Sequence, residues 1–541
     1  MSERNDLRLS DAIETRAEQR PDHDVLTFEH FSLDGGAGAD EIRTYRMLRD
    51  NSHRIAAYLQ TKGLRKGDRF AIMMRNHPEF VEAMIAASLL GAVFVPIDPR
   101  TRGEKLAFML RHSGSRGVIA ADYALEAVHA VSEQTPGCEW VLALATQEEG
   151  ACSTAELARA DSLREVLAGP VATVASTPVA LTDPAQIIYT SGTTGDPKGV
   201  IGDVQRMGNT GWVGRLFGYQ PDERPYTGLS FTHSNAQTTA LLPALFAGHR
   251  AIISRRFTKS KLWDVCRRYG ATSFSVLGGM ATAIFSEPVR PDDADNPVRM
   301  IISGGMPAAI WEPFERRFGV KIFEIYGASD GGGMAFKRPG EGPVGSFGKP
   351  MPGIVMKILD AQGEECPPGV VGEICCRPEG GEASIEYFGD PQASRSKIRD
   401  GWNRSGDMGH RDADGWFFFD YRAGGGIRRN GDFINPSFVE RVIAEDPQVD
   451  DVFVYGVPVS SGAPGEKDVV AAVKPVDHAR FDVQAVFARC RAGLEPNFAP
   501  SYLQIVPEIP KTASEKPQER LLIERLRTHP HEVHTDRGGA R

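Results

Sequence analysis

The stretch YTSGTTGDPKG, residues Tyr189–Gly199, directly follows two isoleucines. Its glycines and hydroxyl side chains predict a turn that exposes backbone N–H groups and hydroxyls together after a buried strand. Such a concave turn suits phosphate oxygens, and Lys198 adds a positive charge. A Walker P-loop needs glycine before its lysine and Ser or Thr after it, whereas here Pro197 precedes the lysine and Gly199 follows it. The stretch favours a phosphate-binding loop of another kind; the alternative is a surface turn without a ligand.

Around this loop, short apolar segments alternate with helix-like segments. The run from Ala83 to Ile97 falls short of the roughly 20 residues of a membrane span, and it predicts a buried helix, a turn and a buried strand. The alternation predicts an α/β fold with parallel sheets covered on both faces, and ligands at the loops after the strands. The expected strands are RFAIMM, AVFVPID, RGVIAA, QIIYT, RAIIS, TSFSVL, VRMIISG and VKIFEIYG, and PEFVEAMIAASLL is an expected helix.

The pattern changes from about Gly345, where short strands and many turns predict a small β-subdomain. A fresh α/β pattern follows, with PSFVERVIAED as a helix and VDDVFVYGV as a strand. Three glycines, Gly424–Gly426, mark a joint between domains. The tail from about Thr528 contains three histidines, and its composition favours a frayed terminus over a metal site.

Composition excludes some classes of function. The 541 residues suggest two to four packed units, and a net charge of −9 argues against a nonspecific nucleic-acid binder. The N-terminus is too polar for a secretory signal. Seven cysteines without a CxxC spacing predict reduced thiols in a cytoplasmic protein, and the adjacent Cys375 and Cys376 make a poor metal clamp.

Four further motifs follow the loop: ISGGMP (Ile302–Pro307), YGASD (Tyr326–Asp330), SGDMGHRDADGWFFFDYR, and PKTASEK (Pro510–Lys516). Each motif alone is weak, but in this order and spacing the five resemble the AMP-forming adenylating superfamily, which contains acyl-CoA synthetases, peptide-synthetase adenylation domains and luciferases. The resemblance spans residues 8 to 526, and the region from FDYRAGGG to IAEDP loosely resembles crotonobetaine/carnitine-CoA ligases.

The resemblance implies a large N-terminal AMP-binding domain, residues 1–422, made of two doubly wound sheets plus the β-subdomain. A small mobile α+β lid domain, residues 423–541, would follow. The implied ligands are ATP, or the AMP moiety of an acyl-adenylate, together with coenzyme A, Mg²⁺ and a small-molecule carboxylic acid. No nucleic acid and no membrane span are expected, and a homodimer is left open.

The resemblance also implies the residues of the site. The phosphates would lie against the loop, the adenine against ISGGMP and YGASD, the ribose against a carboxylate and an arginine, and Mg²⁺ against an aspartate. A carboxylate suits two vicinal hydroxyls because it accepts a hydrogen bond from both. The phosphate-loop residues are Thr190, Ser191, Gly192, Thr193, Thr194, Gly195 and Lys198, and the adenine-side residues are Gly304, Gly305, Met306, Tyr326, Gly327, Ala328 and Ser329. The ribose residues are Asp407 and Arg422, and the Mg²⁺ ligand is Asp330.

Two residues are candidates for roles next to the reacting groups. Lys516 would bridge the carboxylate and the α-phosphate, where a mobile ammonium matches growing negative charge. His233, in LSFTHSNAQ, would gate or shape the acyl pocket rather than act as a base. The alternatives are a solvated loop lysine, a satisfied loop histidine and, for Asp330, a helix cap. After adenylation the small domain would rotate and admit the thiol.

The sequence departs from the family pattern at the lysine. Glu515-Lys516-Pro517 stands where the family has Gly-Lys-Ile, and Gly424 stands at the hinge position. An AMP-forming acyl-CoA ligase is the first reading, with a role in secondary metabolism left open. The departures motivate an alternative, a ligase that has lost adenylation and takes a preformed acyl-adenylate from a partner enzyme to CoA. Loading of a carrier-protein phosphopantetheine, a luciferase-like oxygenase and a non-catalytic nucleotide-binding relative remain further alternatives.

Overall fold

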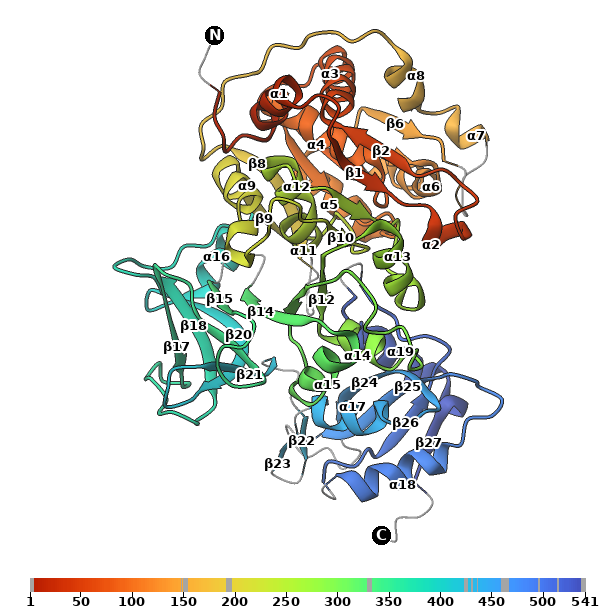
Figure 1. Cartoon of the computed structure of the whole chain (residues 1–541), viewed down its shortest axis with the longest axis vertical. Coiled ribbons are helices and arrows are strands. Elements are labelled where there is room, and N and C mark those ends of the chain that lie inside the picture. The colour runs from red at the N-terminus through yellow and green to blue at the C-terminus, as the bar shows by residue number, and fades with distance from the viewer. Residues whose placement is uncertain are drawn as a thin grey trace.

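Two extended β-sheets and a smaller C-terminal sheet organise the chain (Figure 1). The mixture of sheets and covering helices, with a smaller α+β part at the C-terminal end, confirms the predicted α/β class. The computed structural model describes residues 4–146, 148, 154–190, 197–327, 333–422, 427–429, 432–434, 436–458, 467–494, 497–512 and 515–536.

The first sheet has seven strands in the order β7-β6-β5-β3-β4-β8-β9. Its strands are parallel except for the last pair, in which β8 and β9 run antiparallel. The predicted phosphate loop therefore connects two antiparallel neighbours at one edge of a parallel sheet. The strands are β3 (Arg69–Met73), β4 (Val93–Pro96), β5 (Ser115–Ala121), β6 (Trp140–Leu144), β7 (Asp161–Ser162), β8 (Pro184–Thr190) and β9 (Lys198–Asp203).

The second sheet has a parallel half and an antiparallel half. Strands β14, β13, β12, β10, β11 and β1 lie parallel, and β15 and β16 continue the sheet into the β-subdomain. The predicted β-subdomain is continuous with this sheet through the pairing of β16 with β21. The parallel half comprises β1 (Asp24–Phe28), β10 (Pro225–Thr227), β11 (Ala251–Ile253), β12 (Ser273–Leu277), β13 (Met300–Gly304) and β14 (Lys321–Gly327). The others are β2 (Glu41–Thr44), β15 (Met334–Lys337), β16 (Ser346–Pro350), β17 (Ile354–Leu359), β18 (Gly372–Pro378), β19 (Ile398–Arg399), β20 (Trp402–Arg411) and β21 (Phe417–Arg422).

Helices cover these sheets, and α4 (Pro78–Leu90) is buried along almost its whole length. It begins with Pro78 and ends at Gly91, whose φ of 64° is a left-handed conformation that glycine adopts without strain. The predicted buried helix, turn and strand are confirmed here. The other helices of the large part are α1 (Leu9–Gln19), α2 (Phe31–Asp34), α3 (Tyr45–Thr61), α5 (Gly103–Ser113), α6 (Asp122–Ala130), η1 (Ser132–Gln134), α7 (Thr154–Leu157), α8 (Leu163–Ala168), α9 (Val204–Gly211), α10 (Gly214–Phe217), α11 (Ser234–Ala236), η2 (Gln237–Leu241), α12 (Leu242–Ala247), η3 (Lys259–Lys261), α13 (Leu262–Tyr269), α14 (Gly278–Phe285), α15 (Ala308–Phe318) and α16 (Pro391–Lys397).

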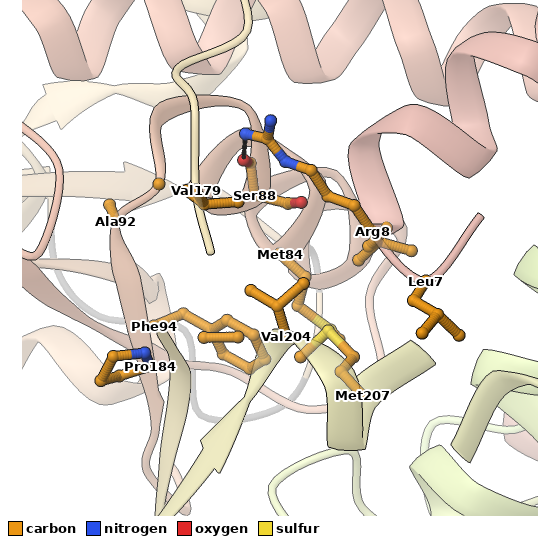
Figure 2. Close-up of a pocket in the computed structure, with 13 residues that line it drawn as sticks. Leu7, Arg8, Met84, Ser88, Ala92, Phe94, Val179, Pro184, Val204 and Met207 are labelled. Carbon is orange, nitrogen blue, oxygen red and sulfur yellow. Dashed lines mark hydrogen bonds between the residues drawn. The ribbon is translucent and has the colours of Figure 1, made fainter. Parts of the chain in front are cut away.

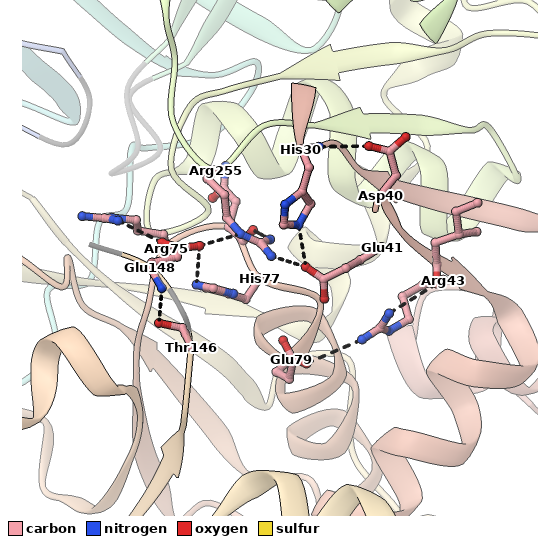
Figure 3. Close-up of polar contacts among 12 residues, drawn as sticks. His30, Asp40, Glu41, Arg43, Arg75, His77, Glu79, Thr146, Glu148 and Arg255 are labelled. Carbon is pink, nitrogen blue, oxygen red and sulfur yellow. Dashed lines mark hydrogen bonds and ion pairs between the residues drawn. The ribbon is translucent and has the colours of Figure 1, made fainter. Parts of the chain in front are cut away.

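A buried polar network joins the two large sheets (Figure 3). Arg255, which follows β11, pairs with Glu41, the first residue of β2, and with Glu148, whose Oε1 lies 2.9 Å from Arg255 Nε. Asn76, buried before α4, donates from Nδ2 to the carbonyls of Leu229 and Ser254, each at 2.9 Å. Because these groups come from segments far apart in sequence, the network fixes the two sheets relative to each other.

The C-terminal part has a four-stranded sheet in the order β24-β25-β26-β27. The tail does not fray as expected: η4 (Pro530–Glu532) and β27 (Val533–Thr535) are formed, and β27 pairs with β26. The predicted joint, Gly424–Gly426, lies outside the described residues. No helix in the described ranges is long and apolar enough to cross a membrane. The remaining elements are β22 (Ile427–Arg429), β23 (Asp432–Ile434), α17 (Pro436–Ala444), β24 (Val449–Pro458), β25 (Lys467–Pro475), α18 (Val483–Gly493), β26 (Tyr502–Ile505) and α19 (Glu519–Thr528).

Candidate active site

The parallel strands β13 and β14 bring two of the predicted motifs together. Ser303 pairs with Glu324, so the glycine turn after β13 lies beside the end of β14. Glu324 Oε1 accepts hydrogen bonds from the backbone N–H groups of Gly305, at 2.6 Å, and Met306, at 3.2 Å. Gly305 has a φ of 99°, a conformation that favours glycine. Glu324 therefore holds the turn that contains the predicted adenine-side residues.

Burial raises the pKa of Glu324 to about 7, against the lowering effect of the Gly305 and Met306 amides. An acid whose folded pKa exceeds its unfolded value stabilises the fold below the unfolded pKa, and this contribution is lost as pH rises through the folded pKa. We expect Glu324→Gln to keep the turn, since an amide oxygen also accepts, but to remove this titration. The melting temperature of wild type minus that of Glu324→Gln should fall as pH rises from about 4.5 to 7. A difference that is flat or rises over this window would contradict the assignment.

The second feature is a contact between strands β14 and β20. Tyr326 donates its hydroxyl to Asp407 Oδ2 at 2.8 Å, and Arg422 Nε donates to Asp407 Oδ1 at 2.8 Å. The register of β20 and β21 places Asp407 opposite Arg422. One face of the Tyr326 ring stacks on Phe347, with centroids 4.4 Å apart. Three predicted nucleotide residues therefore form one cluster, the Tyr326–Asp407–Arg422 cluster.

The ends of the phosphate loop are held by the β8–β9 pair. Thr190 and Lys198 lie opposite each other, and Thr190 Oγ1 donates to the Lys198 carbonyl at 3.3 Å. The Lys198 ammonium lies 5.2 Å from the ring centroid of Tyr387. The predicted residues Ser191–Gly195, and Ala328–Asp330 of the signature, lie outside the described residues. Their roles, including Asp330 as a Mg²⁺ ligand, stay predictions.

His233 lies at the start of α11 in a turn closed by the hydrogen bond from its backbone N–H to the Ser230 carbonyl, at 3.0 Å. Burial lowers the pKa of its imidazole to about 4; Asp98 opposes this shift, and the positive charges of Lys516 and Arg100 add to it. An imidazole that is neutral at pH 7 with so low a pKa is a weak base. This supports the prediction that His233 shapes the pocket rather than abstracting a proton.

Lys516 is carried on a tight turn of the C-terminal part. The Thr512 N–H donates to the Lys516 carbonyl at 2.8 Å, and the Lys516 N–H donates to Thr512 Oγ1 at 3.2 Å. Lys511 and Pro517 form a β-bridge at the base of this turn. The positive charge of Lys516 contributes to the lowered pKa of His233, so the turn lies within electrostatic range of that histidine. Two predicted residues 283 positions apart in the chain are thus near enough for the charge of one to affect the pKa of the other.

Glu515 occupies a left-handed conformation, with a φ of 58°. A residue with a Cβ is strained there by about 1–2 kcal/mol, whereas glycine is not. Burial raises the pKa of its carboxyl, while the charges of Lys511 and Arg100 oppose the shift. The predicted departure at this position therefore has a structural cost directly before Lys516.

We expect Glu515→Gly to raise the rate of pyrophosphate release by about two- to tenfold, because it removes both the strain and a carboxylate directly before Lys516. Glu515→Gln keeps the strained conformation and removes only the charge, so it separates the two causes. If strain dominates, Glu515→Gln should behave like wild type while Glu515→Gly is faster. Equal rates for all three proteins would show that neither the strain nor the charge limits the reaction.

A further pocket lies away from the predicted site residues. Figure 2 shows a pocket beside the N-terminal segment, in which Arg8 Nη2 donates to the Ser88 carbonyl at the end of α4. Its lining is otherwise mainly apolar and contains none of the predicted site residues. Within the described ranges, no group of three or more His, Cys, Asp or Glu side chains could hold a metal ion.

Sequence reasoning missed Glu324, Asp98 and Arg100. Glu324 is the acidic residue in the strand VKIFEIYG and is flanked by Phe323 and Ile325, which was a usable signal because a buried carboxylate needs partners. Asp98 and Arg100 lie two residues apart, and Arg100 Nη2 donates to Asp98 Oδ2 at 2.9 Å. No local pattern pointed to their closeness to His233, which arises from the packing of segments distant in the chain.

Known protein families match this chain in two segments. A family model described as AMP-binding enzyme matches residues 13–381, and one described as AMP-binding enzyme C-terminal domain matches residues 439–516. The crotonobetaine/carnitine–CoA ligase of Proteus mirabilis (strain HI4320) is 29% identical over 482 residues, 87% of this chain and 91% of the relative. The medium/long-chain-fatty-acid–CoA ligase FadD17 of Mycobacterium marinum (strain ATCC BAA-535 / M) is 30% identical over 458 residues, 83% of this chain and 85% of the relative.

Solved structures share the fold. The anthranilate CoA ligase AuaEII in complex with anthranoyl-AMP aligns with a TM-score of 0.80 at 20% identity, covering 96% of both chains. ATP-bound MatB from Rhodopseudomonas palustris aligns with a TM-score of 0.76 at 22% identity, covering 95% of this chain and 98% of MatB. The first family match alone covers more than half of the residues, and the second follows it in the expected order. This chain belongs to the AMP-binding enzyme family.

Proposed function

We propose that the protein is an ATP-dependent, AMP-forming acyl-CoA ligase. It converts a carboxylic acid to an acyl-adenylate and then to the CoA thioester. The observation that carries the proposal is the Tyr326–Asp407–Arg422 cluster, in which three residues predicted to hold the nucleotide meet through hydrogen bonds. The matched relatives named as CoA ligases support the same activity.

In the first step, a carboxylate oxygen forms a bond to the α-phosphorus of ATP, and the bond to the pyrophosphate oxygen breaks. The Tyr326–Asp407–Arg422 cluster is proposed to hold the ribose, with Asp407 accepting from its hydroxyls. The turn at Gly305 is proposed to lie against the adenine. The Lys516 ammonium is proposed to neutralise charge that grows on the carboxylate and phosphate oxygens.

In the second step, the CoA sulfur forms a bond to the acyl carbon, its proton passes to solvent, and AMP leaves. The neutral His233 borders the proposed acyl pocket without taking a proton. Helix α14 (Gly278–Phe285) is proposed as another wall, and its small residues leave room for a bulky or long acid. The same proposal includes Mg²⁺ as a ligand and residues 1–422 and 423–541 as two domains. It also includes a cytoplasmic location, which rests on the cysteine usage.

The test is a panel of carboxylic acids, each incubated with ATP and Mg²⁺, with and without CoA, and analysed by mass spectrometry. The panel should include betaines, aromatic acids and fatty acids, together with their synthetic adenylates. We expect at least one acid to release pyrophosphate without CoA and to give its thioester when CoA is added. Thioester from an adenylate but never from the free acid would favour the ligase that has lost adenylation. No thioester from any arm would refute the proposal.

A further inference from the structure

A chain of four charges joins the large part of the protein to the C-terminal part. Lys259 Nζ, at the start of η3, lies 2.5 Å from Asp450 Oδ1 on β24 and 3.1 Å from Glu287 Oε1 of its own part. Asp450 Oδ2 lies 2.7 Å from Lys474 Nζ on β25. The charges alternate in sign from Glu287 to Lys474, and the central link, Lys259–Asp450, crosses between the two parts.

The same edge of β24 also supports the lysine turn. The register with β25 shifts between Val449 and Asp451, so Asp450 is the extra residue of a β-bulge. The neighbouring Asp451 lies 2.5 Å from Lys511 Nζ, at the base of the turn that carries Lys516. Two adjacent carboxylates on β24 therefore link the parts: Asp450 pairs with Lys259 of the large part, and Asp451 pairs with Lys511 at the base of the lysine turn.

We propose that Lys259 and Asp450 are positioning residues for adenylation: their ion pair holds the C-terminal part, and with it the turn that carries Lys516, in place against the large part. Neither residue is proposed to touch a substrate. The pair acts through β24 and the Asp451–Lys511 contact, which fix the base of the lysine turn.

The arrangement of charges makes this link reversible. When the central pair opens, Lys259 keeps Glu287 and Asp450 keeps Lys474, so neither charge is left without a partner. Breaking a buried pair is costly chiefly because it strands a charge, and that penalty is absent here. The side chains of Lys259 and Asp450 are 28% and 21% exposed, so water also reaches them. The link can therefore favour one arrangement without preventing the movement that the second step needs.

The kinetic test compares the two half-reactions in the full-length protein, and this arm rests on the proposed function. It uses the acid that the panel selects and the synthetic adenylate of that acid. Lys259→Met and Asp450→Asn should each lower the pyrophosphate-release rate by about two- to fivefold, as expected for a partly exposed pair. The ATP KM should not change, and thioester formation from the supplied adenylate should stay equal or rise. A fall of both half-reactions by the same factor would overturn the proposal, because a general folding defect acts on both.

A double variant and a matched control complete this arm. The double variant Lys259→Met/Asp450→Asn should be no slower than the slower single variant, since the second change removes nothing more. Lys62 is a matched control because its side chain is 30% exposed and it pairs at 2.7 Å with Asp161, within the large part. Lys62→Met should leave both half-reactions unchanged. Multiplying effects in the double variant, or a Lys62→Met effect as large as that of Lys259→Met, would overturn the proposal.

A second arm needs no substrate. A carbodiimide joins an amine to a carboxylate without a spacer, and the products can be identified by mass spectrometry after digestion. We expect a cross-link between Lys259 and Asp450 and, as the internal reference, one between Lys259 and Glu287. Detecting the reference without the Lys259–Asp450 product would overturn the proposal. A wild-type enzyme inactive on every acid would refute the proposed function, while this arm would still decide whether the contact exists.

Discussion

Replacing Lys516 with alanine is expected to slow pyrophosphate release by about 10²–10³-fold, the range found when a group that stabilises developing charge is removed. The reason is its position on a tight turn, from which its charge contributes to the lowered pKa of the His233 imidazole in the large part. Thioester formation from a supplied acyl-adenylate should stay within a few-fold of wild type, because the bond to the α-phosphate is already made. The measurement is the single-turnover rate of each half-reaction with saturating ATP.

The control for this variant is Lys321→Ala. Lys321 is an exposed lysine at the start of β14, at the opposite end of the strand from Tyr326, and its side chain is 67% exposed. It should leave both half-reactions unchanged. A Lys516→Ala protein that adenylates at the wild-type rate would remove Lys516 from the mechanism and leave the turn as a structural element.

Local sequence patterns predicted the helices and strands that depend mainly on neighbouring residues. Helix α4 was expected because the apolar run from Ala83 to Ile97 is too short for a membrane span, and it forms over Pro78–Leu90. The strands of the parallel sheets were expected because short apolar segments alternate with helix-like segments. The continuity of the β-subdomain with the second sheet was not, because the pairing of β16 with β21 joins segments about 70 residues apart.

The histidine-rich tail shows the same limit. Its composition resembles that of a frayed terminus, yet residues Val533–Thr535 pair with β26 (Tyr502–Ile505). Without the tail, one edge of β26 would have unpaired backbone groups, and the tail pairs with that edge. The sequence of the tail alone does not indicate that such an edge is present. Polar composition alone was therefore a poor guide to order.

The candidate site was predicted residue by residue from the family motifs, not from the geometry. The motifs named Tyr326 and Asp407, but their hydrogen bond joins residues 81 positions apart, which the sequence could not show. Glu324 lies two residues before Tyr326 and was missed, since its role depends on the turn from the neighbouring strand. The sequence thus indicated which residues matter, while the partners that orient them came from the fold.

Asp407→Asn is expected to raise the Kd for ATP by about 10- to 10²-fold, because hydrogen bonds to a charged acceptor contribute about 1.5–3 kcal/mol and both carboxylate oxygens are in use. The asparagine keeps one acceptor oxygen and turns an N–H₂ group toward Tyr326 or Arg422, each of which now donates to Asp407. The Tyr326 ring, stacked on Phe347, would then lose its polar anchor. ATP affinity can be measured by isothermal titration calorimetry without knowing the acid.

The matched control for this change is Asp420→Asn on the neighbouring strand β21. Asp420 Oδ2 lies 2.8 Å from His410 Nδ1, so the same substitution alters an ion pair on the same sheet without touching the Tyr326–Asp407–Arg422 cluster. We expect Asp420→Asn to bind ATP as wild type does. If Asp407→Asn also binds ATP with wild-type affinity, the ribose does not lie at Asp407. The cluster would then serve only to join β14 to the β-subdomain, since Tyr326 and Asp407 come from those two regions.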